Sequence, residues 1–544
     1  MNLHCVVSNG MEMAFNPSMK SIKRRHVLVL HLLLLLFLTE ARSQAAIWQA
    51  KSLSAADVQS AINGASAGDT VVIPAGSTNW TTNVTISIPI TVQGAGVGLT
   101  TITSGWPGSI GGGGGELFTL TATKTNQLTR LTGMSLDGNE TGGGIDVRGS
   151  VIYGLFRIDH VNIIHSAREG IEVWNQVAGV IDHCTILNCY LLIGQYYGTS
   201  EDTSWQMPIT IGTTNTVVTE DCVFSYAAGD SYIPYQSSFE HGQGARICYR
   251  HNTWTNFSTT GIFPIFDMHG NQGVVDTNND VLVGGGVRGT RQTEFYNNIF
   301  DNKNNSGYMV YYRGGVLMVF SNKWVGPYLD SAYRCSEEDG TARFNLLSSY
   351  PGYDMHWLWS WNNTGSSGAI TSWYSAGNVN TGGACNDSTF LLNGTNMFFT
   401  APSATASGYP ELFLATKWKT SPPITNYTPL VYPHPLVSGT NTPVAGPVIS
   451  QVAVSFDTNN VVTVAWITDT LSSSIVNYGT STNYGTSVTN VAQAQVVAHA
   501  VKLQSFVDSF IVHYQVKSID MLGNVGTSTD TNLPTPPPAN FHHQ

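Results

Sequence analysis

Tyr249-Arg-His-Asn-Thr-Trp254 and Phe295-Tyr-Asn-Asn-Ile-Phe300 are two copies of one short pattern, and this pattern decides the fold. Each copy holds a few strand-forming residues, then Asn or His, and then an apolar residue. The smallest spacing between copies is 23 residues, from His160 to His183, and other spacings run from 25 to 46. Further copies lie at Ile158–Ile163, Ile181–Ile186, Thr219–Phe224, Phe320–Trp324 and Trp359–Asn363.

A repeat of this length is too short for a helical pair or a propeller blade, and it fits one coil of a parallel β-helix. Each coil buries its inward side chains against the coil below, and its backbone pairs with both neighbouring coils. Asn at the turns accepts left-handed backbone angles and can bond to its equivalent in the next coil. The alternative is a β-sandwich with Asn-rich turns.

The composition agrees with an all-β chain. Only 11% of the 544 residues are charged, glycine is abundant at 55 residues, and long helical periodicity is absent. Such a composition is typical of a chain with many strands and turns. The length is sufficient for two or three domains.

Residues 1–45 are predicted to be a secretory signal. Basic residues precede a twelve-residue apolar run at Val27–Leu38, and small residues follow it. The run is shorter than the ~20 residues that span a bilayer. We therefore expect a secreted or cell-surface protein whose mature chain has no transmembrane span and is a monomer; a signal anchor is the alternative.

The remainder of the chain is acidic. Residues 1–45 hold five of the 24 Lys and Arg residues and two of the 35 Asp and Glu residues, which leaves a net charge of −14. We expect no nucleic-acid binding, because its affinity comes from basic groups that displace phosphate counterions. The same charge repels a polyanionic sugar unless divalent cations bridge the sugar to the protein.

Six cysteines follow residue 45, and none shows the Cys-x-x-Cys spacing of a metal site. Cys184 and Cys222 hold the same place in their copies of the pattern, so they are predicted to stack in neighbouring coils. Buried thiols and the disulfides of an oxidising compartment both remain open. The six are Cys184, Cys189, Cys222, Cys248, Cys335 and Cys385.

A family resemblance rests on the two ends of residues 46–436. A short amphipathic helix is predicted at Ala55–Asn63, and the segments Gly68–Gly76 and Val84–Gly94 follow it. This order resembles secreted pectate-lyase-like proteins, in which a helix caps the open end of the core. Tyr432-Pro-His-Pro-Leu436 is similar to the closing strand of many such proteins. The resemblance implies a right-handed parallel β-helix with an N-terminal helical cap.

A second domain follows the β-helix. Residues 437–447 are a linker rich in Pro, Gly and Thr, and residues 448–531 contain several strand-like segments, with Trp466 as the expected core aromatic. The pattern, with Tyr478-Gly-Thr480 as the best match, resembles the fibronectin type III-like module that precedes the catalytic domain of purple acid phosphatases. Residues 532–544 are predicted to be a disordered tail.

Polar side chains suited to chemistry concentrate in the pattern copies at 246–254 and 288–300 and in the insertion between them. In pectate-lyase-like proteins the ligand groove runs along the outer face of one strand stack, and we predict the site there. Arg291 and Glu294 are three residues apart, so they would point to opposite faces of a straight strand. A turn at about Gln292 would bring both outward.

β-Elimination on a uronate polymer needs a base at C5 and a cation that neutralises the substrate carboxylate. Histidine titrates near neutral pH, so His269 is the predicted base, and Arg288 and Arg291 are predicted to carry the transition-state charge. These three are the predicted catalytic residues. The predicted substrate-binding residues are Glu294, Arg250, His241 and Arg313, and the predicted ligands of a calcium ion are Asp267 and Glu240.

Hydrolysis needs paired carboxylates instead, and the motif set of the polygalacturonases is missing here. Phe266–Gly270 is only a faint echo of it. We therefore predict a polysaccharide lyase that acts on an extracellular acidic polysaccharide. The alternative is a non-catalytic surface or matrix protein that binds glycans on a β-helix stalk. The histidines of the pattern, His160, His183 and His251, are predicted to be turn residues rather than ligands.

Overall fold

The computed structural model describes most of the chain between residues 45 and 534. The described ranges are 45–106, 115–166, 169–175, 177–194, 209–225, 239–255, 266–270, 289–301, 310–326, 333–335, 355–370, 374–375, 397–403, 424, 426–438, 447–458, 460–490, 496–505, 512–519 and 525–534.

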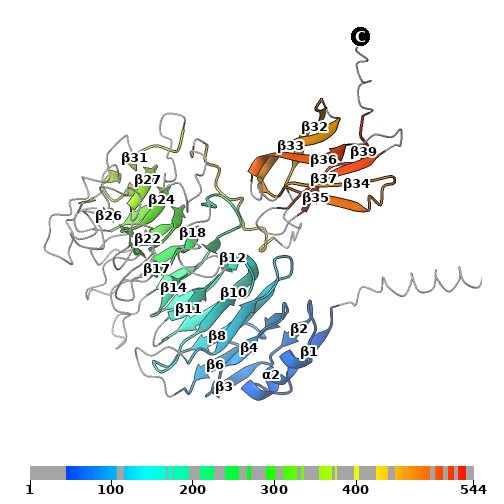
Figure 1. The fold of residues 1–544 in the computed structure, drawn as a ribbon. Helices are drawn as coiled ribbons and strands as arrows, with labels where there is room; N and C mark the ends of the chain where they lie inside the picture. The colour runs from blue at the N-terminus through cyan, green and yellow to red at the C-terminus, as the bar shows by residue number, and fades with distance from the viewer. Residues whose placement is uncertain are drawn as a thin grey trace, which may run out of the picture. The chain divides into compact units, whose positions relative to one another are not determined.

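The described residues between 47 and 398 form a parallel β-helix (Figure 1), and the pairing of its strands gives three stacks. Stack 1 contains β1 (Ile47–Gln49), β2 (Thr70–Val72), β5 (Thr91–Gln93), β8 (Thr129–Asp137), β10 (Gly154–Ile164), β12 (Val177–Asp182), β15 (Val217–Glu220), β18 (Arg246–Arg250), β21 (Gln292–Tyr296), β24 (Gly315–Phe320), β27 (Met355–Trp361) and β31 (Met397–Phe398).

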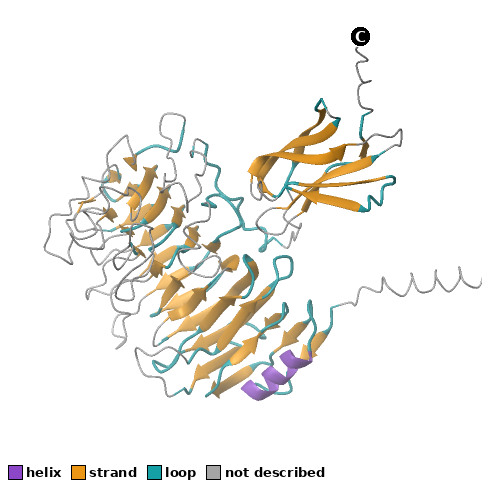
Figure 2. Cartoon of the chain, viewed as in Figure 1, coloured by secondary structure: helices purple, strands orange, loops and turns teal. Residues whose placement is uncertain are grey.

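Stack 2 contains β3 (Gly76–Trp80), β6 (Thr100–Ser104), β13 (Thr185–Leu187), β16 (Val223–Ser225), β19 (Thr253–Thr255), β22 (Ile299–Asp301), β25 (Lys323–Val325) and β28 (Thr364–Gly365), with β29 (Gly368–Ala369) antiparallel to β28. Stack 3 contains β4 (Val84–Ile86), β7 (Phe118–Ala122), β9 (Ile145–Gly149), β11 (Glu169–Trp174), β14 (Tyr190–Gly194), β17 (Phe239–Gly242), β20 (Phe266–Met268), β23 (Val310–Tyr312), β26 (Tyr333–Cys335) and β30 (Tyr374–Ser375). The predicted fold class is confirmed, and Figure 2 shows how strands dominate the described chain.

The repeated sequence pattern is the turn between stack 1 and stack 2. Its first turn residue has a left-handed backbone, with φ of 51° at His160 and His183 and 55° at Asn297. The following residue points inward, where it is buried, as at Asn298. The sequence predicted that one Asn would both accept the left-handed angle and bond to the next coil. The structure divides these two tasks between adjacent residues.

The inward residues form a ladder of buried amides across four coils, Asn252, Asn298, Asn322 and Asn363. Each Nδ2 donates to the Oδ1 of the next coil's Asn, at 3.2, 3.0 and 3.0 Å. Each Oδ1 also accepts the backbone N–H of the Asn in the preceding coil, at 3.0–3.1 Å. The ladder therefore satisfies amide groups that would otherwise be buried without partners.

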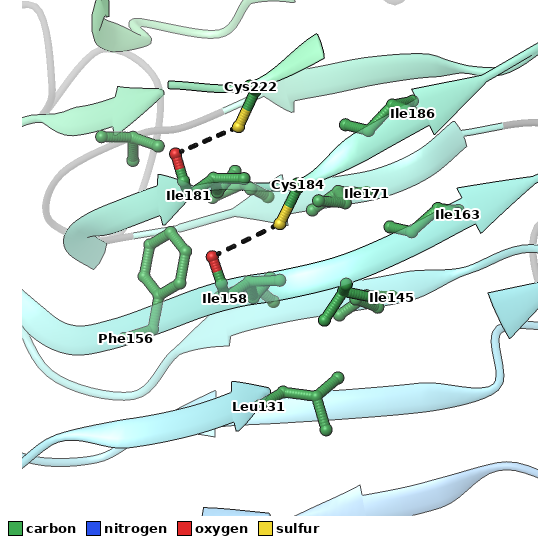
Figure 3. Packing of buried hydrophobic residues seen from close by; sticks show 14 of the residues in the cluster. Leu131, Ile145, Phe156, Ile158, Ile163, Ile171, Ile181, Cys184, Ile186 and Cys222 are labelled. Carbon is green, nitrogen blue, oxygen red and sulfur yellow. Dashed lines mark hydrogen bonds between the residues drawn. The ribbon is translucent and has the colours of Figure 1, made fainter. Parts of the chain in front are cut away.

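Cys184 and Cys222 occupy the ladder position in earlier coils, as predicted (Figure 3). Their thiols lie 3.7 and 3.6 Å from the carbonyl oxygens of Ile158 and Ile181, each in the coil below. Both cysteines are buried thiols, and Cys189 and Cys248 are buried thiols as well. Of the two alternatives, the described cysteines are buried thiols; the side chain of Cys335 and all of Cys385 lie outside the described part.

The core beneath stack 2 is an aromatic ladder. The rings of Phe224, Trp254, Phe300 and Trp324 stack in successive coils, with centroids 4.9, 4.7 and 5.5 Å apart. All four side chains are almost completely buried. Because each ring packs on the ring of the next coil, the apolar core depends on the same register as the amide ladder.

The helical cap is present as α2 (Ala55–Gly64), at the β1–β3 end of the stacks (Figure 1). Ser54 is its N-cap, and the Ser54 hydroxyl accepts the backbone N–H of Asp57. Val58 and Ile62 are buried on the face of the helix that covers the first coils. None of the helices among the described residues has the length and apolar character needed to cross a bilayer.

The C-terminal residues form two antiparallel sheets with one shared core. One sheet holds β32 (Ile449–Phe456), β33 (Val461–Ser472) and β36 (Val496–Ser505), and the other holds β34 (Ile475–Gly479), β35 (Thr486–Thr489), β37 (His513–Ile519), β38 (Val525–Thr527) and β39 (Thr531–Asn532). Trp466 is buried between them, as predicted, and its indole N–H donates to Ser518 Oγ at 2.9 Å. Membership in the fibronectin type III class stays a prediction.

The predicted closing strand at Tyr432–Leu436 is not a strand. Residues 426–438, here called the closing segment, have no strand pairing and lie against the outer face of stack 1. Leu430 and Leu436 are buried there against Val218 and Tyr296. Side chains of stack 1 hold the segment, rather than a backbone ladder, for which its three prolines would lack N–H donors.

We predict that Asn298→Ala lowers the free energy of unfolding by on the order of 2 kcal/mol, because several amide partners lose their bonds in a dry core. Urea unfolding monitored by circular dichroism measures this. The matched control is Asn297→Gly, since Asn297 is exposed and glycine adopts its left-handed angle without strain. Equal losses at the two adjacent positions would contradict the role of the ladder.

Candidate functional site

Two predicted substrate-binding residues, Arg250 and Glu294, lie on the outer face of stack 1 and are completely buried. Arg250 pairs with Glu220 at 2.7 Å, and its NH2 donates to the carbonyl of Val431 at 2.9 Å. The Tyr427 hydroxyl donates to Glu294. The closing segment therefore covers both side chains and uses them as anchors.

Further contacts bind the closing segment along the same face. Arg157, which forms a bidentate pair with Asp182, donates to the carbonyl of Leu436 at 2.9 Å. Glu220 accepts the backbone N–H of His434 at 2.8 Å. Burial lowers the pKa of His434 to about 3, so this imidazole is neutral at physiological pH. The outer face of stack 1 is therefore a packed interior surface where the closing segment covers it.

The turn predicted at Gln292 is absent, because β21 runs straight from Gln292 to Tyr296. Glu294 points outward in register with Cys248, whereas Arg291 precedes the strand and is 2% exposed. The structure thus does not bring Arg291 and Glu294 into one groove with His269. Arg288 lies outside the described residues, so its predicted role is untested.

Stack 3 brings together three of the predicted residues, Asp267, His269 and Arg313. Arg313 donates to both carboxylate oxygens of Asp267, from Nε at 2.8 Å and from NH2 at 2.5 Å. The same NH2 lies 3.1 Å from His269 Nδ1, and the Arg313 guanidinium lies 5.0 Å from the centre of the Tyr311 ring. The His269 side chain is 19% exposed to solvent. We call these three residues the Arg313 cluster.

Glu240 and His241 are placed by their backbones alone. Glu240 in β17 is in register with Asp267, so the two predicted calcium ligands occupy neighbouring backbone positions in adjacent strands. His241 is in register with Met268, which is buried in the core. Their side chains lie outside the described part of the structure.

The described residues do not fit a calcium ion at Asp267. Calcium takes six to eight oxygen ligands, and both oxygens of Asp267 already accept hydrogen bonds from Arg313. Among the residues that the structure describes, no three His, Cys, Asp or Glu side chains are grouped to hold a metal. We derive no step through calcium.

Sequence analysis missed a second cluster on stack 3, here called the acidic cluster. Asp146 and Arg148 point outward from β9, and Glu172 and Trp174 occupy the matching positions of β11. Glu116 and Glu169 carry further nearby carboxylates. The sequence does contain an indication of this cluster. Asp146-Val-Arg148 and Glu172-Val-Trp174 each place one buried residue between two outward ones, as in a strand whose side chains alternate.

The acidic cluster perturbs its own titration. The pKa of Glu172 is raised to about 7, chiefly by burial and also by the carboxylates of Glu169, Asp146 and Glu116, against the opposing effect of Trp174. Burial also raises the pKa of Asp146, although its Oδ2 accepts a hydrogen bond from Arg148 Nε at 2.8 Å. A protonated carboxyl near neutral pH is a hydrogen-bond donor and marks a candidate site.

No protein-family model matches the chain, and no curated protein matches it. Solved structures do match. The catalytic unit of a GH87 α-1,3-glucanase from Streptomyces thermodiastaticus is 12% identical, with 63% of this chain and 68% of that chain covered and a TM-score of 0.27. The A-module of the mannuronan C-5 epimerase AlgE6 from Azotobacter vinelandii is 15% identical, with 60% and 88% covered and a TM-score of 0.29.

The tailspike protein gp49 of Acinetobacter baumannii bacteriophage Fri1, a capsular polysaccharide depolymerase, is 9% identical, with 91% of this chain and 79% of that chain covered and a TM-score of 0.26. Likenesses at this level carry no argument about the reaction.

We predict that Glu294→Gln changes how stability depends on pH. Burial raises the pKa of Glu294 from 4.5 to about 7, so the folded state binds more protons than the unfolded state in this window. Wild-type stability therefore falls as pH rises from 4.5 to 7. Glutamine cannot ionise, so the variant should gain on the order of 3 kcal/mol relative to wild type between these pH values.

Urea unfolding of both proteins at several pH values measures the difference. The test is how the difference in unfolding free energy between the two proteins changes with pH, because the glutamine amide adds a packing contribution that is the same at every pH. Parallel stability curves would show that Glu294 is not buried beneath the closing segment.

Proposed function

We propose that the chain is a secreted polysaccharide lyase that cleaves an acidic polysaccharide by β-elimination at the Arg313 cluster. The observation that carries the proposal is the contact of one guanidinium with both Asp267 and His269 on an outer face of the β-helix. A fixed cation beside a titratable imidazole is the combination that this elimination needs.

Asp267 orients Arg313 in the proposed reaction. Its carboxylate engages two nitrogens of the guanidinium in a fixed plane, and such a plane matches a substrate carboxylate. As C5 loses its proton, negative charge moves onto that carboxylate. A positioned guanidinium stabilises this charge without reorganising in the transition state.

His269 takes the proton from C5. Arg313 Nη2 lies 3.1 Å from Nδ1, a contact that occupies the lone pair of this nitrogen. In the proposed reaction the imidazole turns from Arg313 to the substrate, so that the unprotonated Nδ1 accepts the C5 proton. The electron pair of the broken C–H bond forms the C4–C5 double bond, and the C4–O bond to the leaving sugar breaks. The leaving oxygen takes up a proton from water, and the imidazolium of His269 returns the C5 proton to water, so the reaction balances.

The second candidate is a non-catalytic glycan-binding protein. The ion pair between Asp267 and Arg313 favours this candidate, because such a pair can bind a sugar without taking part in a reaction. A panel of pectin, alginate, glycosaminoglycans and neutral glycans separates the two functions. Ultraviolet absorbance reports the unsaturated product of a lyase, and reducing ends report any cleavage. Binding without either signal would identify the second candidate.

On the substrate so identified, His269→Ala should lower kcat by roughly 100-fold or more, as expected for loss of a positioned base. Arg313→Lys should lower it as well, because lysine cannot reproduce the bidentate geometry. Steady-state kinetics and thermal melts measure both. The matched control is His160→Asn, at an exposed turn position whose left-handed angle Asn tolerates. Full turnover of His269→Ala, or its unfolding, would overturn the assignment.

A further inference from the structure

The acidic cluster carries more negative charge than its surroundings compensate. Glu116, Asp146, Glu169 and Glu172 contribute four carboxylates, whereas Arg148 is the guanidinium whose charge acts on Asp146. The Arg148 side chain is 48% exposed, and its Nε donates a hydrogen bond to Asp146 Oδ2 at 2.8 Å. Such a surface repels uronate groups and attracts a cation.

A buried acceptor within the cluster accepts no hydrogen bond in the described structure. The Asp146 side chain is 7% exposed, and its Oδ1 has no donor, although Oδ2 is bonded to Arg148. Buried carboxylate oxygens are normally satisfied, so an exception calls for an explanation. A donor supplied by a ligand on the outer face of β9 explains it.

Trp174 forms an apolar platform beside these carboxylates. Its ring lies so close to the backbone of Gly194 in β14 that a Cβ there would approach the ring at 2.5 Å. Arg148 lies 6.0 Å from the ring centre. Gly242 follows Gly194 in the same register row, so no side chain stands between the platform and the next strand. Aromatic faces of this kind take the apolar face of a sugar ring.

We propose that the outer face of β9 and β11 binds a cationic amino sugar, with the sugar ring on Trp174 and the ammonium group between Asp146 and Glu172. The ammonium supplies the donor that Asp146 Oδ1 lacks. It also stabilises the ionised form of Glu172, which burial and like charges disfavour. A neutral sugar would leave this repulsion in place. The inference does not rest on lyase activity, because binding is measured without turnover.

Isothermal titration calorimetry tests the proposal with three oligosaccharides of equal length, namely oligoglucosamine, its fully N-acetylated counterpart and an oligouronate. We expect oligoglucosamine to bind at least tenfold more tightly than the other two. At pH 7 about half of Glu172 is protonated, so its ionisation on binding should release on the order of half a proton. This release is measured as the difference between wild type and Glu172→Gln, because the sugar amines take up protons in the same pH range. Titrations in buffers of different ionisation enthalpy count that proton.

Glu172→Gln should abolish the proton release and weaken binding about tenfold, and Trp174→Ala should weaken it without abolishing the release. The matched control is Glu140→Gln, an exposed acid on the turn after β8. Equal affinity for the acetylated oligomer, no proton release, or unchanged binding by Glu172→Gln would each overturn the proposal. So would calcium binding with the same proton release but no sugar binding, which would identify a metal site.

Discussion

The backbone at the turn between stack 1 and stack 2 has to be hydrogen-bonded away from water in every coil, and the rest of the structure depends on this constraint. A left-handed residue such as Asn297 turns the chain, and the amide of Asn298 fills the space inside the turn. That amide bonds to the coil before and the coil after. A shift of one residue would break these bonds and also expose the aromatic ladder, so the register is fixed.

The fixed register places the outward side chains in rows. Stack 1 and stack 3 both carry charged rows, but within the described residues only the row on stack 1 is covered by another segment of the chain. On stack 1, Arg157 and Arg250 hold the closing segment through its carbonyls. On stack 3, His269 and Trp174 stay partly exposed. β11 and β20 are three strands apart in the sheet, or about 14 Å at the usual strand spacing. One extended glycan can therefore contact both the Arg313 cluster and the acidic cluster.

The sequence predicted the fold well because each strand pattern is local. The copies of the pattern, the cap at Ala55 and the core residue Trp466 all follow from periodicity and turn chemistry within a few residues. The division of labour between Asn297 and Asn298 was hidden, since both residues are Asn and only backbone geometry separates them. Periodicity also could not show that residues 432–436 would form an irregular segment rather than a strand.

The site was harder to predict because it depends on contacts between distant residues. Arg250 and Glu294 resemble ligand groups in the sequence, and only the closing segment, more than 130 residues beyond Glu294, shows that they are buried anchors. Asp267 and Arg313 were both selected, but their pairing required the register of β20 and β23. Glu172 was missed because a single acid in an alternating strand is indistinguishable from an ordinary surface residue until its neighbours in the next coil are known.

The central claim is that glycans bind on the outer face of stack 3 and not on the face covered by the closing segment. Hydroxyl-radical footprinting with and without a bound oligosaccharide tests this most directly, because each face has a reactive aromatic residue at its surface. The account predicts protection of Trp174 or Tyr311 on stack 3, with unchanged labelling of Tyr432, which is 46% exposed on the closing segment. Protection of Tyr432 with unchanged labelling of both stack 3 aromatics would contradict it.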